Sequence, residues 1–268
     1  MTSDVFAPAK INLTLHVTGQ RGDGYHLLDS VVVFADLGDR LSFAPQDHLS
    51  LSVTGPFAAG VPSDHRNLVW KAAVQAGLEA AITLEKNLPH GAGIGGGSSD
   101  AAAVLRHAGA GQGAAALGAD VPVCLMPRAQ RMRGIGDRLD VIADLPPLWA
   151  VLVNPDVHVP TPQVFNALTN KDNMPMPAVL SRFGTTRGLI DWLADMRNDL
   201  EPPAIMSAPK IATVLSAIAA SDGVGLTRMS GSGSTCFGLF ETAPAAQAAM
   251  RRLSAHRPDW WVRACSLS

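Results

Sequence analysis

Several kinds of residue are scarce in this 268-residue sequence. Its three cysteines, Cys124, Cys236 and Cys265, are too few and too widely spaced for a disulfide framework or a zinc site, so we expect structural thiols in a reducing compartment. Lysine and arginine (21) nearly balance aspartate and glutamate (23). The protein therefore has no strong positive electrostatic field that would attract nucleic acid or an anionic membrane. The longest apolar run, Leu148 to Val153, is far too short to cross a bilayer. With no signal-peptide pattern at the N-terminus, we expect a cytoplasmic protein that binds neither nucleic acid nor membrane.

The sequence is long enough for two compact domains, since 47% of its residues are apolar. The proline-rich stretch 155–162 is the best candidate for a junction, which predicts domains at 1–154 and 155–268. Residues 10–17 alternate polar and apolar side chains, the pattern of a half-buried strand, so Lys10 and Asn12 are expected to share its polar face. A helix over 67–81 behind a capping Asn67, and strands at 82–86, 118–126 and 149–155, complete the first domain.

The C-terminal part shows a regular alternation of helix and strand patterns. We expect helices over 208–221 and 244–256, strands over 225–230, 235–240 and 260–266, and a tight glycine turn over 231–234. That order predicts an antiparallel sheet with helices on one face, of the split-βαβ kind.

The segment PHGAGIGGGSSDAA, residues 89–102, contains five glycines in its first nine positions. It lies between a predicted strand and a helix expected to start near Ser98, where bare backbone N–H groups can bind an anion, most commonly phosphate. A Walker loop is excluded because Gly97 is followed by Ser98 and no lysine. A tight structural turn would need fewer glycines.

The same segment formally matches a dinucleotide fingerprint, because Gly91, Gly93 and Gly96 spell G-x-G-x-x-G. That fingerprint belongs to the first βα turn of a parallel sheet, with an acidic residue about 20 positions further on. Here a proline opens the loop and the preceding strands look hairpin-linked, so the dinucleotide interpretation remains a weak alternative.

The glycine segment resembles the central motif of the GHMP kinases, the superfamily of homoserine, galacto-, mevalonate and phosphomevalonate kinases. Further similar segments occur in order: PAKINLTLHVTGQRGDGYHLLDSVV near the start, LGADVPVCL in the middle, His158 to Pro162, and SGSGSTCFGLF near the end, so the match covers residues 6 to 265 approximately. PAKINL and DGYH resemble the branch whose alcohol substrate carries a cytidine diphosphate group, in the non-mevalonate isoprenoid pathway. The resemblance implies a two-domain α+β fold, with an ATP-binding N-terminal domain containing a left-handed βαβ crossover and a ferredoxin-like C-terminal domain on the substrate side.

The resemblance also implies an ATP-dependent kinase that uses Mg²⁺. Asp120 corresponds to the base that accepts the proton of the substrate hydroxyl, and Lys10 to its neighbour; from the residues alone Asp120 would be a cap or turn residue and Lys10 a surface lysine. Ser98 is a possible metal ligand, although Ser98 and Ser99 equally suit helix capping. The implied ATP-binding residues are Pro89, His90, Gly91, Ala92, Gly93, Ile94, Gly95, Gly96, Gly97, Ser98 and Ser99.

On the substrate side, the resemblance gives Tyr25 and Phe165 as stacking surfaces for cytosine, and His26 as a hydrogen-bonding partner of that base. Asn12 is expected to orient the acceptor hydroxyl, and Thr161 to touch the methylerythritol phosphate. The second glycine-rich turn, Ser230 to Phe237, closes over the phosphates and substrate in the family, although its pattern also fits an ordinary hairpin turn.

Three hypotheses remain open from the sequence. The first is the kinase acting on the cytidylated alcohol; the second is another GHMP kinase such as homoserine kinase, against which the pair Tyr25-His26 argues. The third is a noncatalytic nucleotide-binding protein or, distantly, a dinucleotide enzyme, because only 17 residues separate Asp100 from Gly118 where similar kinases have a longer helical segment. The basic run 128–138 is interpreted mainly as a solvated face, and Asn67-Leu68 with Lys86 as a tentative purine pocket.

Overall fold

The computed structural model describes residues 3–178, 180 and 182–268. Its chain forms two compact units that are discontinuous in sequence. Unit 1 consists of the segments up to Lys10, Leu37–His90 and Gly95–Pro127, and unit 2 of Ile11–Asp36, Gly91–Ile94 and Arg128–Ser268. The junction predicted between residues 154 and 155 lies within unit 2, and the division into two family domains at that point stays a prediction.

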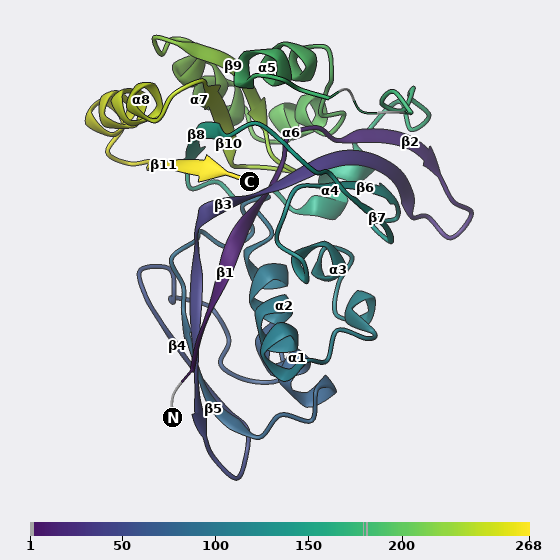
Figure 1. Ribbon diagram of the computed structural model, residues 1–268, viewed down its shortest axis with the longest axis vertical. Helices are drawn as coiled ribbons and strands as arrows, with labels where there is room; N and C mark the ends of the chain where they lie inside the picture. Colours follow the sequence, from purple (N-terminus) through teal and green to yellow (C-terminus); the bar gives the residue numbers. More distant parts are fainter. Residues whose placement is uncertain (1–2, 179, 181) are drawn as a thin grey trace. The chain divides into compact units, whose positions relative to one another are not determined.

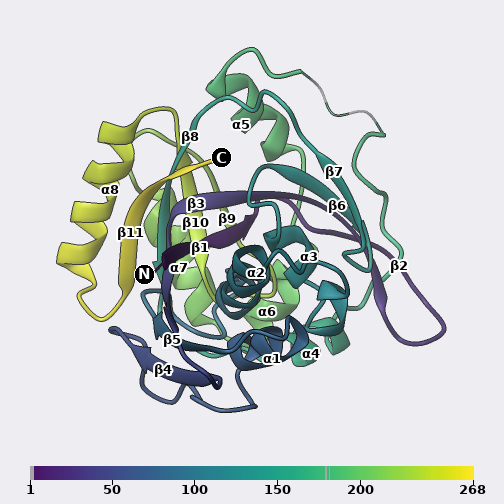
Figure 2. The ribbon, with the colours of Figure 1, turned by 60° about the horizontal axis from the view of Figure 1, so that its bottom comes forward.

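Unit 1 contains a βαβ unit followed by the helix that comes after the glycine segment. Strand β5(Ala80–Glu85) pairs in parallel with β4(Ser50–Thr54). It also pairs in antiparallel fashion with Arg40 to Pro45, the C-terminal part of β3(His26–Pro45). Helices α1 and α2 lie side by side (Figures 1 and 2). The elements are β1(Ser3–Asn12), which ends in unit 2, the C-terminal part of β3(His26–Pro45), β4(Ser50–Thr54), α1(Leu68–Gln75), β5(Ala80–Glu85), α2(Gly96–Ala108), a 3₁₀ turn at Ala114–Ala116 and α3(Val121–Cys124).

Local chemistry explains where the elements of unit 1 agree with the predictions and where they differ from them. Asn67 caps α1 as expected, because its side chain accepts a hydrogen bond from Val69 N–H. The helix ends at Gln75 instead of 81, since Gly77 soon after takes a positive φ of 63°. The predicted strand at 118–126 is wrong: residues 121–124 form α3, and Pro122 suits its first turn because the missing N–H would have no partner there.

The strand predicted over 10–17 exists only in part. It is interrupted between Asn12, where β1 ends, and His16, where β2(His16–Gln20) begins. The expected open polar face is also wrong, because Lys10, Asn12, Thr14 and His16 are all at most 3% exposed. Alternation of polar and apolar residues therefore marks two buried faces here, one of which carries hydrogen-bonding groups.

Unit 2 is built on an antiparallel sheet with the strand order β11(Trp261–Leu267), β8(Leu148–Asn154), β10(Cys236–Phe240), β9(Val224–Met229). Helix α7 packs on β9 and β10, and α8 on β8 and β11, so the split-βαβ prediction is confirmed (Figure 1). A second group of strands joins the N-terminal part of β3 to β2 and β6. The remaining elements are β6(Gln130–Gly134), β7(Arg138–Val141), β8(Leu148–Asn154), α4(Thr161–Asn166), α5(Thr186–Ala194), α6(Glu201–Ser207), α7(Lys210–Ala219), β9(Val224–Met229), β10(Cys236–Phe240), α8(Ala243–His256) and β11(Trp261–Leu267).

The three cysteines are free and buried, as expected for structural thiols. Burial raises the pKa of the Cys124 thiol to about 12 and the pKa values of Cys236 and Cys265 as well, so all three are unreactive at neutral pH. In the part of the chain that the structure describes, every helix is too short or too polar to cross a bilayer.

Candidate active site

The glycine segment is anchored by apolar side chains while its glycines remain accessible. Ala92 and Ile94 are buried, at 5% and 1% exposure, whereas Gly91 is exposed and Gly93 and Gly95 are half-buried. In unit 1, Gly95 has a φ of 63°, and a Cβ added there would lie 3.1 Å from Lys10 Cβ. The backbone at Gly95 therefore lies directly against the Lys10 side chain, an approach and a conformation that favour glycine.

The N-terminus of α2 is left open by its own sequence. Gly95 is the N-cap residue, and no side chain within the described residues caps the helix there. The first intrahelical hydrogen bond is donated by Ser99 N–H to Gly95 O, so the N–H groups of Gly96, Gly97 and Ser98 are not used by the helix. The prediction that Ser98 or Ser99 caps the helix is wrong, since α2 begins before both. Free N–H groups and the positive end of the helix dipole suit a phosphate.

In unit 2, the second glycine turn, residues 230–235, packs against the middle of the glycine segment and is hydrogen-bonded to it. Gly93 has a φ of 75°, and a Cβ added there would lie 2.6 Å from the carbonyl oxygens of Ser230 and Gly233. Ser230 Oγ donates a hydrogen bond to Gly93 O at 3.0 Å, and Thr235 N–H donates one to Ala92 O at 3.0 Å. The turn at residues 230–235 is therefore more than an ordinary hairpin connection, because it packs against the glycine segment.

Lys10 and Asp120, which lie 110 positions apart in the sequence, form an ion pair in unit 1. Lys10 Nζ lies 2.9 Å from Asp120 Oδ2, and the two side chains are 4% and 38% exposed. Asp120 occupies the N-cap position of α3, but its side chain makes no capping hydrogen bond and faces Lys10 instead. The interpretation of Lys10 as a surface lysine is wrong, and Asp120 is the turn residue that the sequence allowed but its side chain caps no helix. The pair combines a buried ammonium with a carboxylate that a ligand can reach.

Asn12 presents one unused acceptor. Its Nδ2 donates to Ser30 Oγ at 2.8 Å, and the Ser30 hydroxyl in turn donates to Thr14 O. Because the Ser30 proton is directed to Thr14, the amide of Asn12 is held with its NH₂ group toward Ser30. Asn12 Oδ1 is buried and has no hydrogen-bond partner among the described residues, so it can accept a hydrogen bond from a ligand hydroxyl.

The predicted base-binding residues share unit 2, and two of them touch. The rings of His26 and Phe165 stack with centroids 4.7 Å apart, whereas Tyr25, beside them in the sequence, is 58% exposed. His26 Nε2 is buried and has no partner in the described part of the chain. Burial, with a smaller contribution from Lys171, lowers the pKa of His26, so its imidazole is neutral at pH 7. Thr161 contacts the second glycine turn, since its Oγ lies 2.8 Å from Ser232 Oγ.

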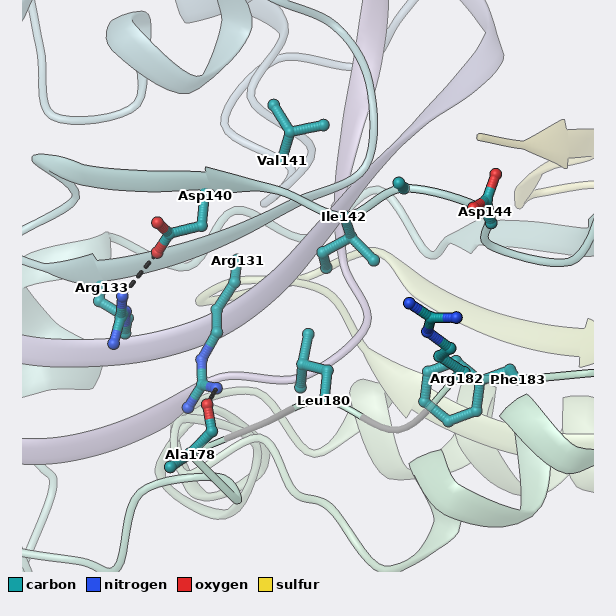
Figure 3. A pocket seen from close by; sticks show the side chains of 11 residues that line it. Arg131, Arg133, Asp140, Val141, Ile142, Asp144, Ala178, Leu180, Arg182 and Phe183 are labelled. Atoms are coloured by element: carbon teal, nitrogen blue, oxygen red, sulfur yellow. Dashed lines mark hydrogen bonds and ion pairs between the residues drawn. The ribbon is translucent and has the colours of Figure 1, made fainter.

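The interpretation of residues 128–138 as a solvated face is wrong for Arg131. Its guanidinium is buried and donates to both carboxylate oxygens of Asp29, at 2.8 and 2.7 Å. Arg131 also lines a hollow of about 480 Å³ in unit 2, with Arg133, Asp140, Leu180 and Phe183 (Figure 3). Arg133 pairs with Asp140 there, and the lining includes none of the residues predicted to bind nucleotide or substrate.

The residues predicted to form a purine pocket have structural partners. Asn67 caps α1 and also donates to Pro62 O at 2.7 Å. Lys86 is buried between Asp39 and Asp100, an arrangement that the sequence analysis missed because no spacing pattern connects these three positions. Among residues 3–178, 180 and 182–268, three or more His, Cys, Asp or Glu side chains nowhere group in a way that could hold a metal ion.

Comparison with known proteins places these features in a family. Residues 67–127 match the GHMP kinases N terminal domain, and residues 178–259 match the GHMP kinases C terminal family. A 4-diphosphocytidyl-2-C-methyl-D-erythritol kinase from Dinoroseobacter shibae is 62% identical over 264 residues, covering 96% of this chain and 92% of that protein. The protein of the same name from Paracoccus denitrificans is 57% identical, with coverages of 98% and 96%.

Solved structures agree with the sequence relatives. A crystal structure of 4-(cytidine 5'-diphospho)-2C-methyl-D-erythritol kinase superposes with a TM-score of 0.79 at 36% identity, covering 99% of each chain. A homoserine kinase from Cytophaga hutchinsonii, at 18% identity and a TM-score of 0.63 over 100% of this chain and 94% of that one, shares the fold. With identities above 50% across nearly its whole length, this chain belongs to the 4-diphosphocytidyl-2-C-methyl-D-erythritol kinase family of GHMP kinases.

Proposed function

We propose that this enzyme transfers the γ-phosphoryl group of ATP to the 2-hydroxyl of 4-diphosphocytidyl-2-C-methyl-D-erythritol, giving the 2-phosphate and ADP. The observation that carries the proposal is the Lys10–Asp120 pair against Gly95 of the glycine segment. A protein that only bound nucleotide would have no use for a reachable carboxylate held by a buried ammonium next to a phosphate-binding backbone.

Asp120 is proposed as the base of the reaction. Its carboxylate takes the proton of the 2-hydroxyl while the hydroxyl oxygen bonds to the γ-phosphorus, and the bond from that phosphorus to the β-phosphate oxygen breaks with its electron pair leaving on ADP. Lys10 stabilises the negative charge that develops on the acceptor oxygen. Because Asp120 is 38% exposed, its acquired proton can pass to water after the transfer.

The nucleotide and metal contacts follow from the open end of α2. We propose that the backbone of residues 89–99 holds the phosphates, chiefly through the unused N–H groups of Gly96, Gly97 and Ser98. A Mg²⁺ ion, which commonly takes most of its ligands from phosphates and water, fits a site with few protein carboxylates. Ser98 is the proposed protein ligand. The ion would neutralise charge on the transferring phosphoryl group.

For the second substrate, we propose that unit 2 recognises the cytosine base. Neutral His26 offers Nε2 as a hydrogen-bonding group with no protein partner in the described part of the chain, and Tyr25 and Phe165 offer aromatic faces. Asn12 is proposed to orient the acceptor hydroxyl before its proton passes to Asp120, and Thr161 is the proposed contact of the substrate phosphate. A cytoplasmic location suits this metabolic reaction and completes the proposal.

The test is an assay of the purified chain with ATP, Mg²⁺ and the cytidylated substrate, in which ADP and the phosphorylated product are both quantified. The expected result is one ADP formed for each 2-phosphate, with no ADP formed when homoserine replaces the cytidylated alcohol. Phosphorylation of homoserine, or no turnover of the cytidylated substrate, would contradict the proposal. Replacing Tyr25 and His26 by alanine is expected to raise the KM of the cytidylated substrate about tenfold or more without changing the KM of ATP.

A further inference from the structure

Lys86 lies at the centre of a buried network of charges in unit 1. Its Nζ contacts Asp39 Oδ2 and lies 2.8 Å from Asp100 Oδ2. Exposure of the three side chains is 4%, 0% and 3%. Two carboxylates from separate parts of the chain therefore converge on one ammonium, out of contact with water.

The Asp39 side of the network holds the backbone just before the glycine segment. Asp39, in the middle of β3, accepts hydrogen bonds through Oδ1 from Asn87 N–H at 2.6 Å and from Leu88 N–H at 2.9 Å. Leu88 is the residue before Pro89, where the proposed phosphate loop begins. A single carboxylate thus fixes both Lys86 and the chain leading into the loop.

The Asp100 side of the network holds the helix that follows the loop. Asp100 is the fifth residue of α2, and Lys86 is bonded to its Oδ2. Gly96, the first residue of α2, lies against the same charges, because a Cβ added there would be 3.5 Å from both Asp39 Oδ2 and Lys86 Nζ. Lys86 consequently joins the segments at the two ends of the phosphate loop.

Stability alone gives no reason for this arrangement. Burial by itself would lower the pKa of Lys86, but attraction to Asp100 and Asp39 raises it. Burial, together with the negative charge of Asp39, raises the pKa of Asp100 to about 8 against the attraction of Lys86. Buried ionic networks are commonly no more stabilising than well-packed apolar side chains of the same shape. Burial opposes the charged form of Asp100 in this network. The positions in which the network holds the neighbouring backbone explain it better than stability does.

We propose that Lys86 is a positioning residue for the nucleotide, which holds the start of the phosphate loop and the N-terminus of α2 at a fixed separation by bridging Asp39 and Asp100. The proposal deepens the proposed function and rests on it for the identity of the nucleotide. With its ammonium paired to Asp39 and Asp100, Lys86 acts through the backbone N–H groups of the loop, which must be pre-organised to bind an anion tightly.

The sharpest test compares two substitutions at one position, Asp100→Asn and Asp100→Leu. Both replace the ionisable carboxyl group and keep the branched side-chain skeleton, and both leave Lys86 paired with Asp39. Only asparagine retains an oxygen that can accept the hydrogen bond from Lys86 Nζ. We expect Asp100→Leu to raise the Kd of ATP about tenfold, as loss of a supporting contact does around metal ligands, and Asp100→Asn to stay within about threefold of the unmodified protein.

Steady-state kinetics distinguish a specific effect on ATP binding from a general loss of structure or activity. In Asp100→Leu the KM of ATP should rise with its Kd, while kcat at saturating ATP and the KM of the cytidylated substrate stay within about twofold. Asp29→Asn, which weakens the buried pair with Arg131 in unit 2, is the control for lost stability and should leave the Kd of ATP unchanged. If leucine at position 100 leaves the protein unfolded, Asp100→Ala makes the same comparison with a smaller side chain.

Two results would overturn the positioning role. One is wild-type affinity for ATP in both Asp100 variants, and the other is an equal loss of affinity in both, which would make the ionisable carboxyl group of Asp100 and not its hydrogen bond with Lys86 responsible. The outcome for the proposed function is separate, since ATP binding is measured without the second substrate. Failure to phosphorylate the cytidylated alcohol, with the expected pattern of ATP affinities, would contradict only the proposed reaction.

Discussion

Unit 1 contains two lysine–aspartate pairs with nearly the same separation and very different surroundings. Lys10 Nζ lies 2.9 Å from Asp120, whose side chain is 38% exposed, and Lys86 Nζ lies 2.8 Å from Asp100, which is 3% exposed. Both lysines are almost fully buried. The difference lies in the carboxylates: one is open to solvent, and the other faces only protein. Access to the carboxylate therefore separates the pair proposed to react from the one proposed to be structural.

The largest expected difference between the two pairs is in turnover. Asp120→Asn removes the proposed base and should lower kcat by about 10²–10⁴-fold, the usual contribution of a positioned proton acceptor. Asp100→Asn should leave kcat at saturating ATP nearly unchanged. Both are measured with the same ADP-release assay, alongside thermal unfolding to show that the variants are folded. Equal losses of kcat in the two variants would remove the distinction between a reactive and a structural pair.

The second difference is in stability. Lys86→Met leaves two carboxylates buried without their cation, so the free energy of unfolding should fall by about 3–5 kcal/mol. Lys10→Met leaves Asp120, which water can solvate, so the loss should be about 1 kcal/mol. Urea denaturation of both variants measures the two values. A larger loss in Lys10→Met would show that exposure of the partner carboxylate does not set the cost.

The smallest expected difference is in the pH dependence of stability. The pKa of Asp100 is raised from its ordinary value of 3.8 to about 8, so the folded protein binds this proton more tightly than the unfolded chain does. The free energy of unfolding should therefore fall as pH rises from about 4 to about 8, because the folded state holds more protons throughout that window.

Asp100→Asn should remove this contribution. Urea denaturation of the unmodified protein and the variant at several pH values gives the difference between their slopes, and subtraction cancels shared contributions such as that of His16, whose pKa is lowered chiefly by burial. Parallel slopes would mean that Asp100 is ionised in the folded protein throughout this range.

Much of the fold was predictable because it follows from local patterns. The helices and strands of residues 208–266, their antiparallel order and the Asn67 cap agree with predictions made from periodicity and capping chemistry. The predicted strand at 118–126 failed because a short apolar run does not distinguish a strand from a single helical turn, and Pro122 favours the latter. The motifs that resemble the GHMP kinases also identified Lys10 and Asp120, which the structure brings together.

The sequence by itself determined the family, the position of the bare glycine backbone and the residue types available for phosphoryl transfer. Only the tertiary structure decided which lysine faces a reachable carboxylate and which is sealed, that the α2 N-terminus lacks a cap, and that Asp39, Lys86 and Asp100 meet. The physical reason is that burial and ion pairing depend on contacts between residues 14 to 110 positions apart, whereas spacing patterns carry information only over a few turns of helix or strand.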